Sequence, residues 1–409
     1  MEQLDPKFCL VPFTSFSISP RGILRTCCVQ YNTGMHKWEN IKDIGQIPWP
    51  TKSMVGMQEK MLGPDIEKNA TECQFCWAQE TLNQPSYRTK HNEYWFRKLG
   101  ETGVQELIKN PKITTLDLQF GHLCNNSCVM CNTSLSSHLY TTKNRLFNQT
   151  TDQEQKAFYD FDLNYIKDHS DWTLNEHSYA KVLELCKPIT EIKISGGEPM
   201  FNPKFVDFIE FLVTKDQPLE RINLTTNGTV YDEKLIELIN RIKQIGHLKI
   251  SVESLGKEEE FIRWPTVWTD KVQNIRKFIE NISIPEQSFE ISSCIQSLNL
   301  LSLVKVQKFV DELKRVYPDK NIFISRQLVG KGDIASSLHS DNEYLDYYLS
   351  AVTPGSGYDD VIKHINMAKA YTEKRTRTQV LYYTDLARLQ GIDFAKTFPV
   401  YWEYHKKYL

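Results

Sequence analysis

The chain has 409 residues, with 49 Lys and Arg against 51 Asp and Glu, so it lacks the clustered basic excess typical of nucleic-acid binding. No apolar run approaches the ~20 residues of a membrane span, and the start lacks a basic segment followed by an apolar core. We therefore expect a cytoplasmic protein with neither membrane nor nucleic-acid partners, whose ten cysteines are metal ligands before they are disulfides.

Five of these cysteines fall in the first hundred residues. Residues 16–28 predict a short β-hairpin that turns at 20–22. A C-x2-C pair then stands at the head of a helical stretch. The set Cys9, Cys27, Cys73 and Cys76 could close a tetrahedral zinc site or a complete [4Fe–4S] cluster, with Cys28 as a substitute for Cys27. The residues alone leave both metals open.

The most informative segment follows a predicted strand at 113–120. Cys124, Cys128 and Cys131 lie within eight residues in C-x3-C-x2-C spacing. Soft thiolates select zinc, Cu(I) or iron–sulfur clusters. A zinc knuckle would need a fourth ligand nearby, and neither His122 nor His138 sits at a usual spacing. The pattern favours a [4Fe–4S] cluster with one iron left open.

Strands and helices alternate after this loop. Strands are predicted at 113–120, 191–195, 222–226, 248–253, 289–297 and 322–328, with helical patterns between them, for example at 203–214, 232–245 and 300–316. This alternation predicts an α/β fold with a parallel sheet. Functional residues of such folds gather at the C-terminal ends of the strands.

The predicted strands have one apolar and one polar face. Apolar residues such as Leu116, Ile192 and Leu248 should pack under helices. The polar face carries Asp117, Gln119, Lys193, Ser195, Asn223, Thr225, Lys249, Ser251, Glu290, Ser292, Cys294 and Gln296. Because unpaired buried charge is costly, this face should line a wet space or hold a polar ligand.

Gly196, Gly197 and Glu198 end the second of these strands in a GGEP turn. Glycines let the backbone approach a ligand closely, and the carboxylate can hold a cationic amine. Together with the cysteine spacing, this turn resembles the radical S-adenosylmethionine (SAM) superfamily over roughly residues 110–330. The resemblance implies a partial (β/α)6 barrel and a [4Fe–4S] cluster on Cys124, Cys128 and Cys131. It also implies that SAM binds the open iron and that its amino group meets the GGE turn.

Further segments resemble SAM contacts of this family. Asn227 lies in a TNG turn, Ser251 and Glu253 end the next strand and could meet ribose hydroxyls, and Arg263 is placed like an arginine that pairs with the SAM carboxylate. The strand at 289–297 lacks the glycine-containing motif that many members carry around adenine. Cys294 on that strand could donate a hydrogen atom to a substrate radical, or it could be an inert buried thiol.

The N-terminal cysteines resemble the twitch fold, a shortened relative of the SPASM domain that holds one auxiliary [4Fe–4S] cluster. In most such enzymes this domain follows the barrel, and here it precedes it. The resemblance therefore favours a second [4Fe–4S] cluster over zinc. We expect a twitch-like domain at 1–105, the barrel at 106–330 and a helical C-terminal extension at 331–409.

The resemblance implies reductive cleavage of SAM to methionine and a 5′-deoxyadenosyl radical, which takes hydrogen from a polar small-molecule or peptide substrate. A flavodoxin- or ferredoxin-type donor would supply the electron. An auxiliary cluster closed by four cysteines would accept an electron and favour a net oxidation or a crosslink. Two alternatives stay open: a maturase of ribosomal peptides whose twitch domain mainly docks the peptide, and a non-catalytic SAM or iron–sulfur binding protein.

Overall fold

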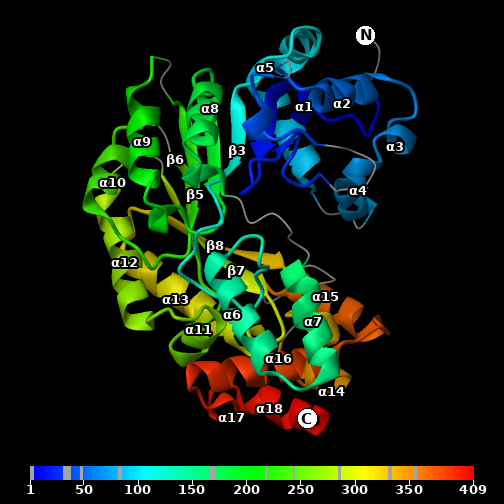
Figure 1. Cartoon of the computed structure of the whole chain (residues 1–409), viewed down its shortest axis with the longest axis vertical. Coiled ribbons are helices and arrows are strands. Elements are labelled where there is room, and N and C mark those ends of the chain that lie inside the picture. Colours follow the sequence, from blue (N-terminus) through cyan, green and yellow to red (C-terminus); the bar gives the residue numbers. More distant parts are fainter. Residues whose placement is uncertain are drawn as a thin grey trace.

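The computed structural model describes residues 4–30, 38–46, 49–81, 85–164, 171–216, 219–242, 245–283, 287–329, 334–352 and 357–409. One eight-stranded sheet runs through it in the order β2-β1-β3-β4-β5-β6-β7-β8 (Figure 1). The strands are β1 (Ser15–Ile18), β2 (Leu24–Arg25), β3 (Thr115–Gln119), β4 (Glu191–Ser195), β5 (Arg221–Thr226), β6 (Ile245–Ser251), β7 (Ser288–Ile295) and β8 (Asn321–Leu328). Strands β3 to β8 are parallel neighbours in chain order. The predicted α/β class with a parallel sheet is confirmed, and closure into a partial barrel stays a prediction.

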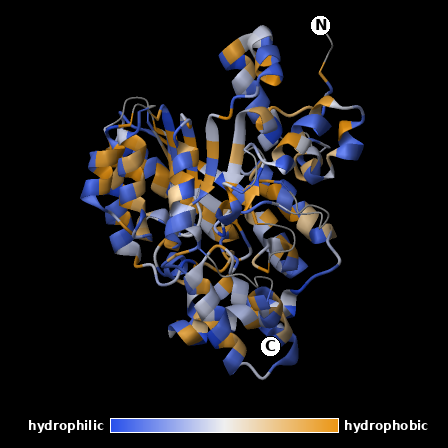
Figure 2. Ribbon diagram, turned by 45° about the horizontal axis from the view of Figure 1, so that its top comes forward, coloured by the Kyte–Doolittle hydropathy of each residue, from blue (hydrophilic) through white to orange (hydrophobic). Residues whose placement is uncertain are grey.

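Helices cover the apolar face of the sheet. They are α8 (Glu176–Cys186), α9 (Phe205–Thr214), α10 (Glu233–Ile239), α12 (Trp268–Asn281) and α13 (Leu303–Val316), of which α8, α9, α10 and α12 lie along one side of the sheet in Figure 1. The strand residues Leu116, Ile192 and Leu248 are fully buried in one core with Phe208 and Ile275 of these helices. Figure 2 shows orange and blue residues mixed along the helices, as amphipathic helices require. The predicted apolar face of the strands is confirmed.

The N-terminal hairpin is part of the same sheet. β1 pairs with β2 antiparallel, as predicted, and with β3 in parallel, with Ser17 opposite Asp117. The helices of this region are α1 (Val11–Thr14), α2 (Lys52–Leu62), α3 (Ile66–Asn69), α4 (Gln74–Thr81) and α5 (Tyr87–Lys109). They share a small core of their own that includes Phe13 and Trp95. Ser86 begins α5 with a capping box, which fixes where this long helix starts.

The remaining helices are α6 (Ser137–Gln149), α7 (Gln153–Asn164), α11 (Lys257–Ile262), α14 (Asn342–Ala351), α15 (Asp359–Ala370), α16 (Thr376–Gln390), α17 (Phe394–Thr397) and α18 (Pro399–His405). The C-terminal helices form a third core, which also buries Val129 and Phe261. In α18 the buried His405 ring stacks on Tyr401 at 3.8 Å and accepts a hydrogen bond of 3.0 Å from the Asp341 N–H. The three cores cross the expected domain boundaries, because Phe16 and Met54 belong to the core of the sheet and Val129 and Phe261 to the C-terminal core. The boundaries at 105 and 330 stay predictions.

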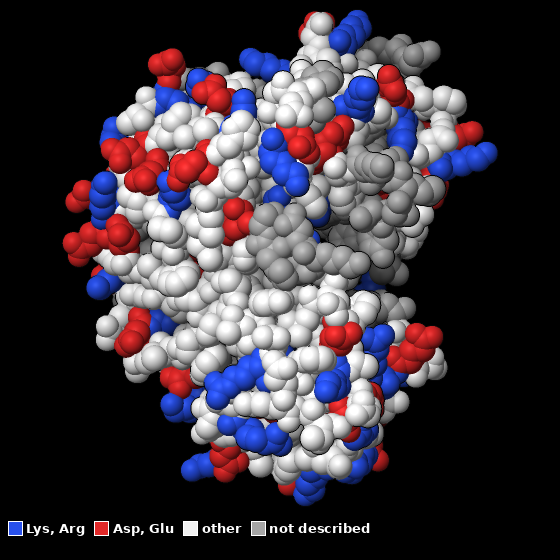
Figure 3. All heavy atoms as spheres, in the orientation of Figure 1, with Lys and Arg blue, Asp and Glu red and all other residues white. Residues whose placement is uncertain are grey.

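On the face in Figure 3, basic and acidic side chains are interspersed, in keeping with the small net charge of −2. Within the described ranges, no helix has the length and apolar character needed to cross a membrane.

Candidate functional site

Residues 124–131, which we call the cluster loop, follow the C-terminal end of β3 and are held by backbone hydrogen bonds. The N–H groups of Ser127 and Val129 donate to the carbonyls of Trp264 at 2.7 Å and Ile262 at 2.9 Å. The last residue of α11 and the segment after it therefore hold the middle of the cluster loop.

The three thiols of the cluster loop lie close together. Cys124 and Cys128 are buried and Cys131 is half-buried. Burial and then the charge of Cys128 raise the pKa of the Cys131 thiol to about 12, and the same two causes raise the pKa of Cys124. Thiolates that repel one another in this way suit a positively charged metal centre. The donor set thus fits the iron–sulfur cluster predicted for it.

The two glycines of the GGE turn let this turn lie directly against the cluster-loop side of β3. The Gly197 N–H donates to the Gly121 carbonyl at 3.0 Å, and the Glu198 N–H donates to the Leu123 carbonyl at 2.8 Å. Gly196 has φ of 130°, which favours glycine, and a β-carbon at 197 would lie 2.2 Å from the Leu123 oxygen. No other residue fits this backbone-to-backbone contact.

The Glu198 carboxylate is buried and occupied by donors of the chain itself. It accepts from the Met200 N–H at 3.1 Å, from the Thr226 hydroxyl at 2.8 Å and from the Asn227 N–H at 2.5 Å. Burial raises the pKa of Glu198, and these hydrogen bonds oppose that rise. Glu198 therefore ties the end of β4 to the end of β5.

Asn227 reaches the cluster loop from β5. Its side-chain amide donates to the side-chain oxygen of Asn125 at 2.8 Å, and the side-chain amide of Asn125 donates to the Thr229 hydroxyl at 2.8 Å. The predicted SAM contact Asn227 and the cluster loop are thus joined by side chains.

Arg263 and Glu253 form a buried pair beside the cluster loop. Arg263 donates to the Glu253 carboxylate through Nε at 3.1 Å, and through a terminal nitrogen to the Cys128 sulfur at 3.5 Å. Glu253 also accepts from the Cys294 N–H at 2.6 Å. Two predicted SAM-binding side chains therefore meet each other and one cluster-loop cysteine.

Cys294 lies near the cluster loop, whereas Ser251 is linked to the site through its backbone. Burial and then the charge of Glu253 raise the pKa of the Cys294 thiol to about 12, and Cys128 contributes to that rise. The Ser251 carbonyl accepts from the Lys271 ammonium at 2.7 Å.

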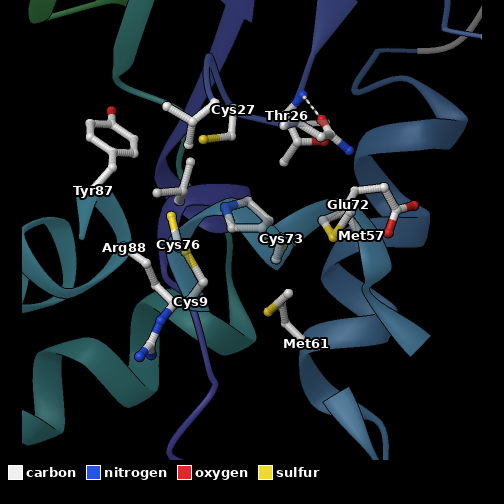
Figure 4. A pocket seen from close by; sticks show the side chains of 14 residues that line it. Cys9, Thr26, Cys27, Met57, Met61, Glu72, Cys73, Cys76, Tyr87 and Arg88 are labelled. Atoms are coloured by element: carbon white, nitrogen blue, oxygen red, sulfur yellow. Dashed lines mark hydrogen bonds between the residues drawn. The ribbon is translucent and has the colours of Figure 1, made fainter. Parts of the chain in front are cut away.

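The four N-terminal cysteines predicted as ligands line one cavity of about 440 Å³ of empty space. Cys9 precedes α1, Cys27 follows β2, and Cys73 and Cys76 stand at the start of α4. Figure 4 shows these cysteines around the cavity, with Tyr87 and Arg88 on one side and methionines of α2 on the other. Residues far apart in the sequence are thus brought together as sulfur donors. Among the described residues, no three Cys, His, Asp or Glu side chains already converge on a single metal-ion position.

Arg88 gives this cavity a buried positive charge. It donates to the Phe8 carbonyl at 2.7 Å and forms an ion pair with Glu80 at 2.5 Å. Its charge acts to lower the pKa of Cys9, although burial of that thiol dominates and raises it. Arg88 therefore offsets only a small part of the effect that burial has on the Cys9 thiol.

Cys28 lies beside this cavity and is not among its lining residues. A hydrogen bond with Cys27, then burial and the charge of Asp117 raise the pKa of the Cys28 thiol well above its usual value. Asp117 belongs to the polar face of β3, so Cys28 is directed to the sheet.

The polar face of the strands lines a second cavity, of about 1280 Å³, which we call the lumen cavity. Its lining side chains come from β3 to β7 and from α5: Tyr87, Lys90, His91, Tyr94, Thr115, Asp117, Glu191, Lys193, Ile194, Ser195, Arg221, Asn223, Leu224, Thr225, His247, Lys249 and Glu290. Seven of the twelve residues predicted on the polar face line this cavity, whereas Gln119, Ser251, Ser292, Cys294 and Gln296 do not. Some of its charges are paired, as in the Lys249–Glu290 bridge of 2.8 Å.

Tyr87 of α5 lines both cavities. The Lys193 ammonium lies 4.3 Å from its ring centre and 3.0 Å from its hydroxyl oxygen. Tyr87 was not predicted from the sequence, because its place beside Lys193 depends on a contact between α5 and β4, which lie far apart in the chain. No local pattern marks such a contact.

Residues 118–284 match the family model of the Radical SAM superfamily. The match includes the cluster loop, the GGE turn, Asn227, Glu253 and Arg263. The chain therefore contains a radical SAM domain, which is an enzyme domain and implies SAM and a [4Fe–4S] cluster as cofactors.

No curated protein matches the chain. Among solved structures, Streptococcus suis SuiB bound to S-adenosylmethionine matches with a TM-score of 0.36 and 12% identity, over 86% of this chain and 69% of that one. SuiB bound to precursor peptide SuiA matches with a TM-score of 0.35 and 11% identity, over 98% of this chain and 75% of that one. Native anSMEcpe with bound AdoMet and a Cp18Cys peptide matches with a TM-score of 0.34 and 15% identity, over 61% of each chain.

Proposed function

We propose that this chain is a radical SAM enzyme with two iron–sulfur clusters, and that its substrate occupies the lumen cavity. The second cluster would be held by Cys9, Cys27, Cys73 and Cys76. One observation supports this proposal above others: the four-cysteine cavity and the lumen cavity share Tyr87 as a wall. A substrate in the lumen cavity would therefore lie next to the second group of cysteines.

Each part of the barrel site has a proposed task. Cys124, Cys128 and Cys131 would hold the first cluster. When bound, this cluster supplies the electron that cleaves SAM into methionine and a 5′-deoxyadenosyl radical. Gly196 and Gly197 would offer backbone to the SAM amino group.

The remaining proposed SAM residues would position these groups. Glu198 and Asn227 would hold the turn against the cluster loop through the hydrogen bonds described above. Arg263 and Glu253 would present a charged pair to the SAM carboxylate and ribose, with Ser251 at the neighbouring strand end. Cys294 would stand close enough to return a hydrogen atom.

The second cluster would most simply accept an electron from the substrate radical, giving a net oxidation or a crosslink. Four cysteine ligands leave no open iron for direct substrate binding. The proton that leaves with this electron would pass to a carboxylate that lines the lumen cavity, such as Asp117. We propose a polar small-molecule or peptide substrate and a flavodoxin- or ferredoxin-type donor. Peptide docking as the main task of the N-terminal region is the second candidate.

The test replaces Cys73 and Cys76 with Ala and compares this variant with Cys186→Ala, which removes a buried thiol of α8 outside both groups. Anaerobically reconstituted wild type and Cys186→Ala should hold about eight iron atoms per chain, and the double variant about four. The double variant should still form 5′-deoxyadenosine. A double variant that keeps all its iron, or a wild type with one zinc and one cluster, would contradict the second cluster.

The same variant separates the two tasks of the second cluster once a product is known. Electron transfer predicts that SAM is cleaved without formation of oxidised product. Docking predicts a raised KM with the chemistry intact at saturation. Loss of SAM cleavage would contradict both and indicate that the N-terminal region only holds the barrel together.

A further inference from the structure

The lumen cavity contains one guanidinium group, that of Arg221, for which the described residues supply no anionic partner. Four Lys or Arg and three Asp or Glu side chains line this cavity. Lys249 pairs with Glu290 at 2.8 Å. The charge of Lys193 lowers the pKa of Asp117, although burial raises it more.

The third carboxylate, Glu191, is bound by two residues of α5. It is the register neighbour of Arg221 on β4, yet it accepts from Lys98 at 2.8 Å and from the Tyr94 hydroxyl. Within the described part of the chain, Arg221 forms no ion pair, and its Nε is buried without a hydrogen-bond partner. A buried donor without a partner is unfavourable, so the described part of the protein does not itself satisfy this guanidinium.

The surroundings of Arg221 keep this group in place. The Tyr94 ring centre lies 5.9 Å from its guanidinium carbon. On β6, Gly246 leaves room for it, because a β-carbon there would lie 3.2 Å from the Arg221 Nε and 2.3 Å from the Asn223 Oδ1. Arg221 and Asn223 share one face of β5 and both line the cavity. Together they offer a charged donor and a neutral amide side by side.

We infer that the lumen cavity binds its substrate through a carboxylate, with Arg221 as the anchoring group. This inference rests on the proposed function and narrows its substrate to carboxylate-bearing molecules, including acidic peptides. One unpaired guanidinium beside a neutral amide matches a single negative charge, because Arg presents paired donors to the two oxygens of a carboxylate. Lys90, exposed at the rim on α5, would draw the anion towards the cavity.

The probes are succinate and 1,4-diaminobutane, which have equal chain length and opposite charge, added to the reconstituted holoenzyme at constant ionic strength. Succinate should bind and raise the melting temperature, and 1,4-diaminobutane should not. Arg221→Met should weaken succinate binding at least tenfold, and Arg221→Lys should weaken it less. Arg276→Met, which removes an arginine paired with Glu312 outside this cavity, should change nothing.

Chemical modification locates the site without a variant. Phenylglyoxal should modify Arg221 in the holoenzyme, and succinate should protect Arg221 but not Arg276, as read by peptide mass spectrometry. Succinate binding that persists in Arg221→Met, the absence of binding to wild type, or stronger binding of the diamine would each overturn the inference. Iron content and 5′-deoxyadenosine formation are measured in the same samples. A wild-type protein that holds no iron or forms no 5′-deoxyadenosine would contradict the proposed function and not this inference.

Discussion

Gly197 and Leu123 are in direct backbone contact: a β-carbon at 197 would lie 2.2 Å from the Leu123 carbonyl oxygen. Leu123 immediately precedes the first cluster-loop cysteine. The position of this loop therefore depends on residue 197 having no side chain. The GGE turn thus helps to position the cluster loop and is also a candidate SAM contact.

Gly197→Ala should displace the cluster loop and prevent assembly of the first cluster. We expect about four iron atoms per chain instead of about eight, and no SAM cleavage. The measurements are iron content and 5′-deoxyadenosine by chromatography. Gly56→Ala in α2 is the matched control, because a β-carbon there meets nothing within 4 Å. Full iron content and normal SAM cleavage in Gly197→Ala would show that the loop does not depend on this contact.

Glu198→Ala should weaken SAM binding by about 1–3 kcal/mol, because three donors lose their buried acceptor. Calorimetric titration with SAM measures this loss. The hydrogen bonds from Met200, Thr226 and Asn227 predict that the variant also melts at a lower temperature in the absence of SAM. A variant with weakened SAM binding and unchanged stability would instead indicate a direct contact between Glu198 and SAM.

His405 should make the C-terminal region sensitive to acid. Burial lowers the pKa of His405 from 6.5 to about 4, so the unfolded chain binds a proton more readily than the folded one between these values. Stability is therefore full above pH 6.5 and falls as the pH drops towards 4, by about 2 kcal/mol at pH 5. Urea unfolding at pH 7 and pH 5 measures this loss.

His405→Gln serves as the control for this pH effect, because glutamine does not titrate and can still accept from the Asp341 N–H. The variant should lose about 2 kcal/mol less than wild type between pH 7 and pH 5. Equal losses in both proteins would assign the acid sensitivity to other groups.

The strands could be predicted from the sequence because their alternation is strict. Residues 191–195 coincide with β4, and the prediction 322–328 differs from β8 by one residue. One face of each strand is buried under helices, and a shift of one residue would expose it, so the pattern specifies the register. The helix predicted at 232–245 ends earlier, at Ile239, because Ile245 already belongs to β6.

The candidate site could be predicted only where its residues stand in local motifs. The cysteines, the GGE turn and Asn227 can each be recognised from short local motifs. The position of β1 beside β3 and the crossing of α5 depend on contacts between distant segments, which no periodicity reports. Arg221 was not predicted, because the predicted strand begins at residue 222 and β5 begins at Arg221.

β1 is paired with β3 along its whole length, from Ser15 opposite Thr115 to Ile18 opposite Leu118. β3 leads into the cluster loop, while the hairpin that starts with β1 delivers Cys27. The pairing of β1 with β3 therefore fixes the position of Cys27 relative to the cluster loop. Along these strands each residue adds a rise of about 3.3 Å. No hinge lies between the two cysteine groups on this path. If both groups hold clusters as proposed, the distance between the clusters depends on the register of the sheet and not on a flexible linker.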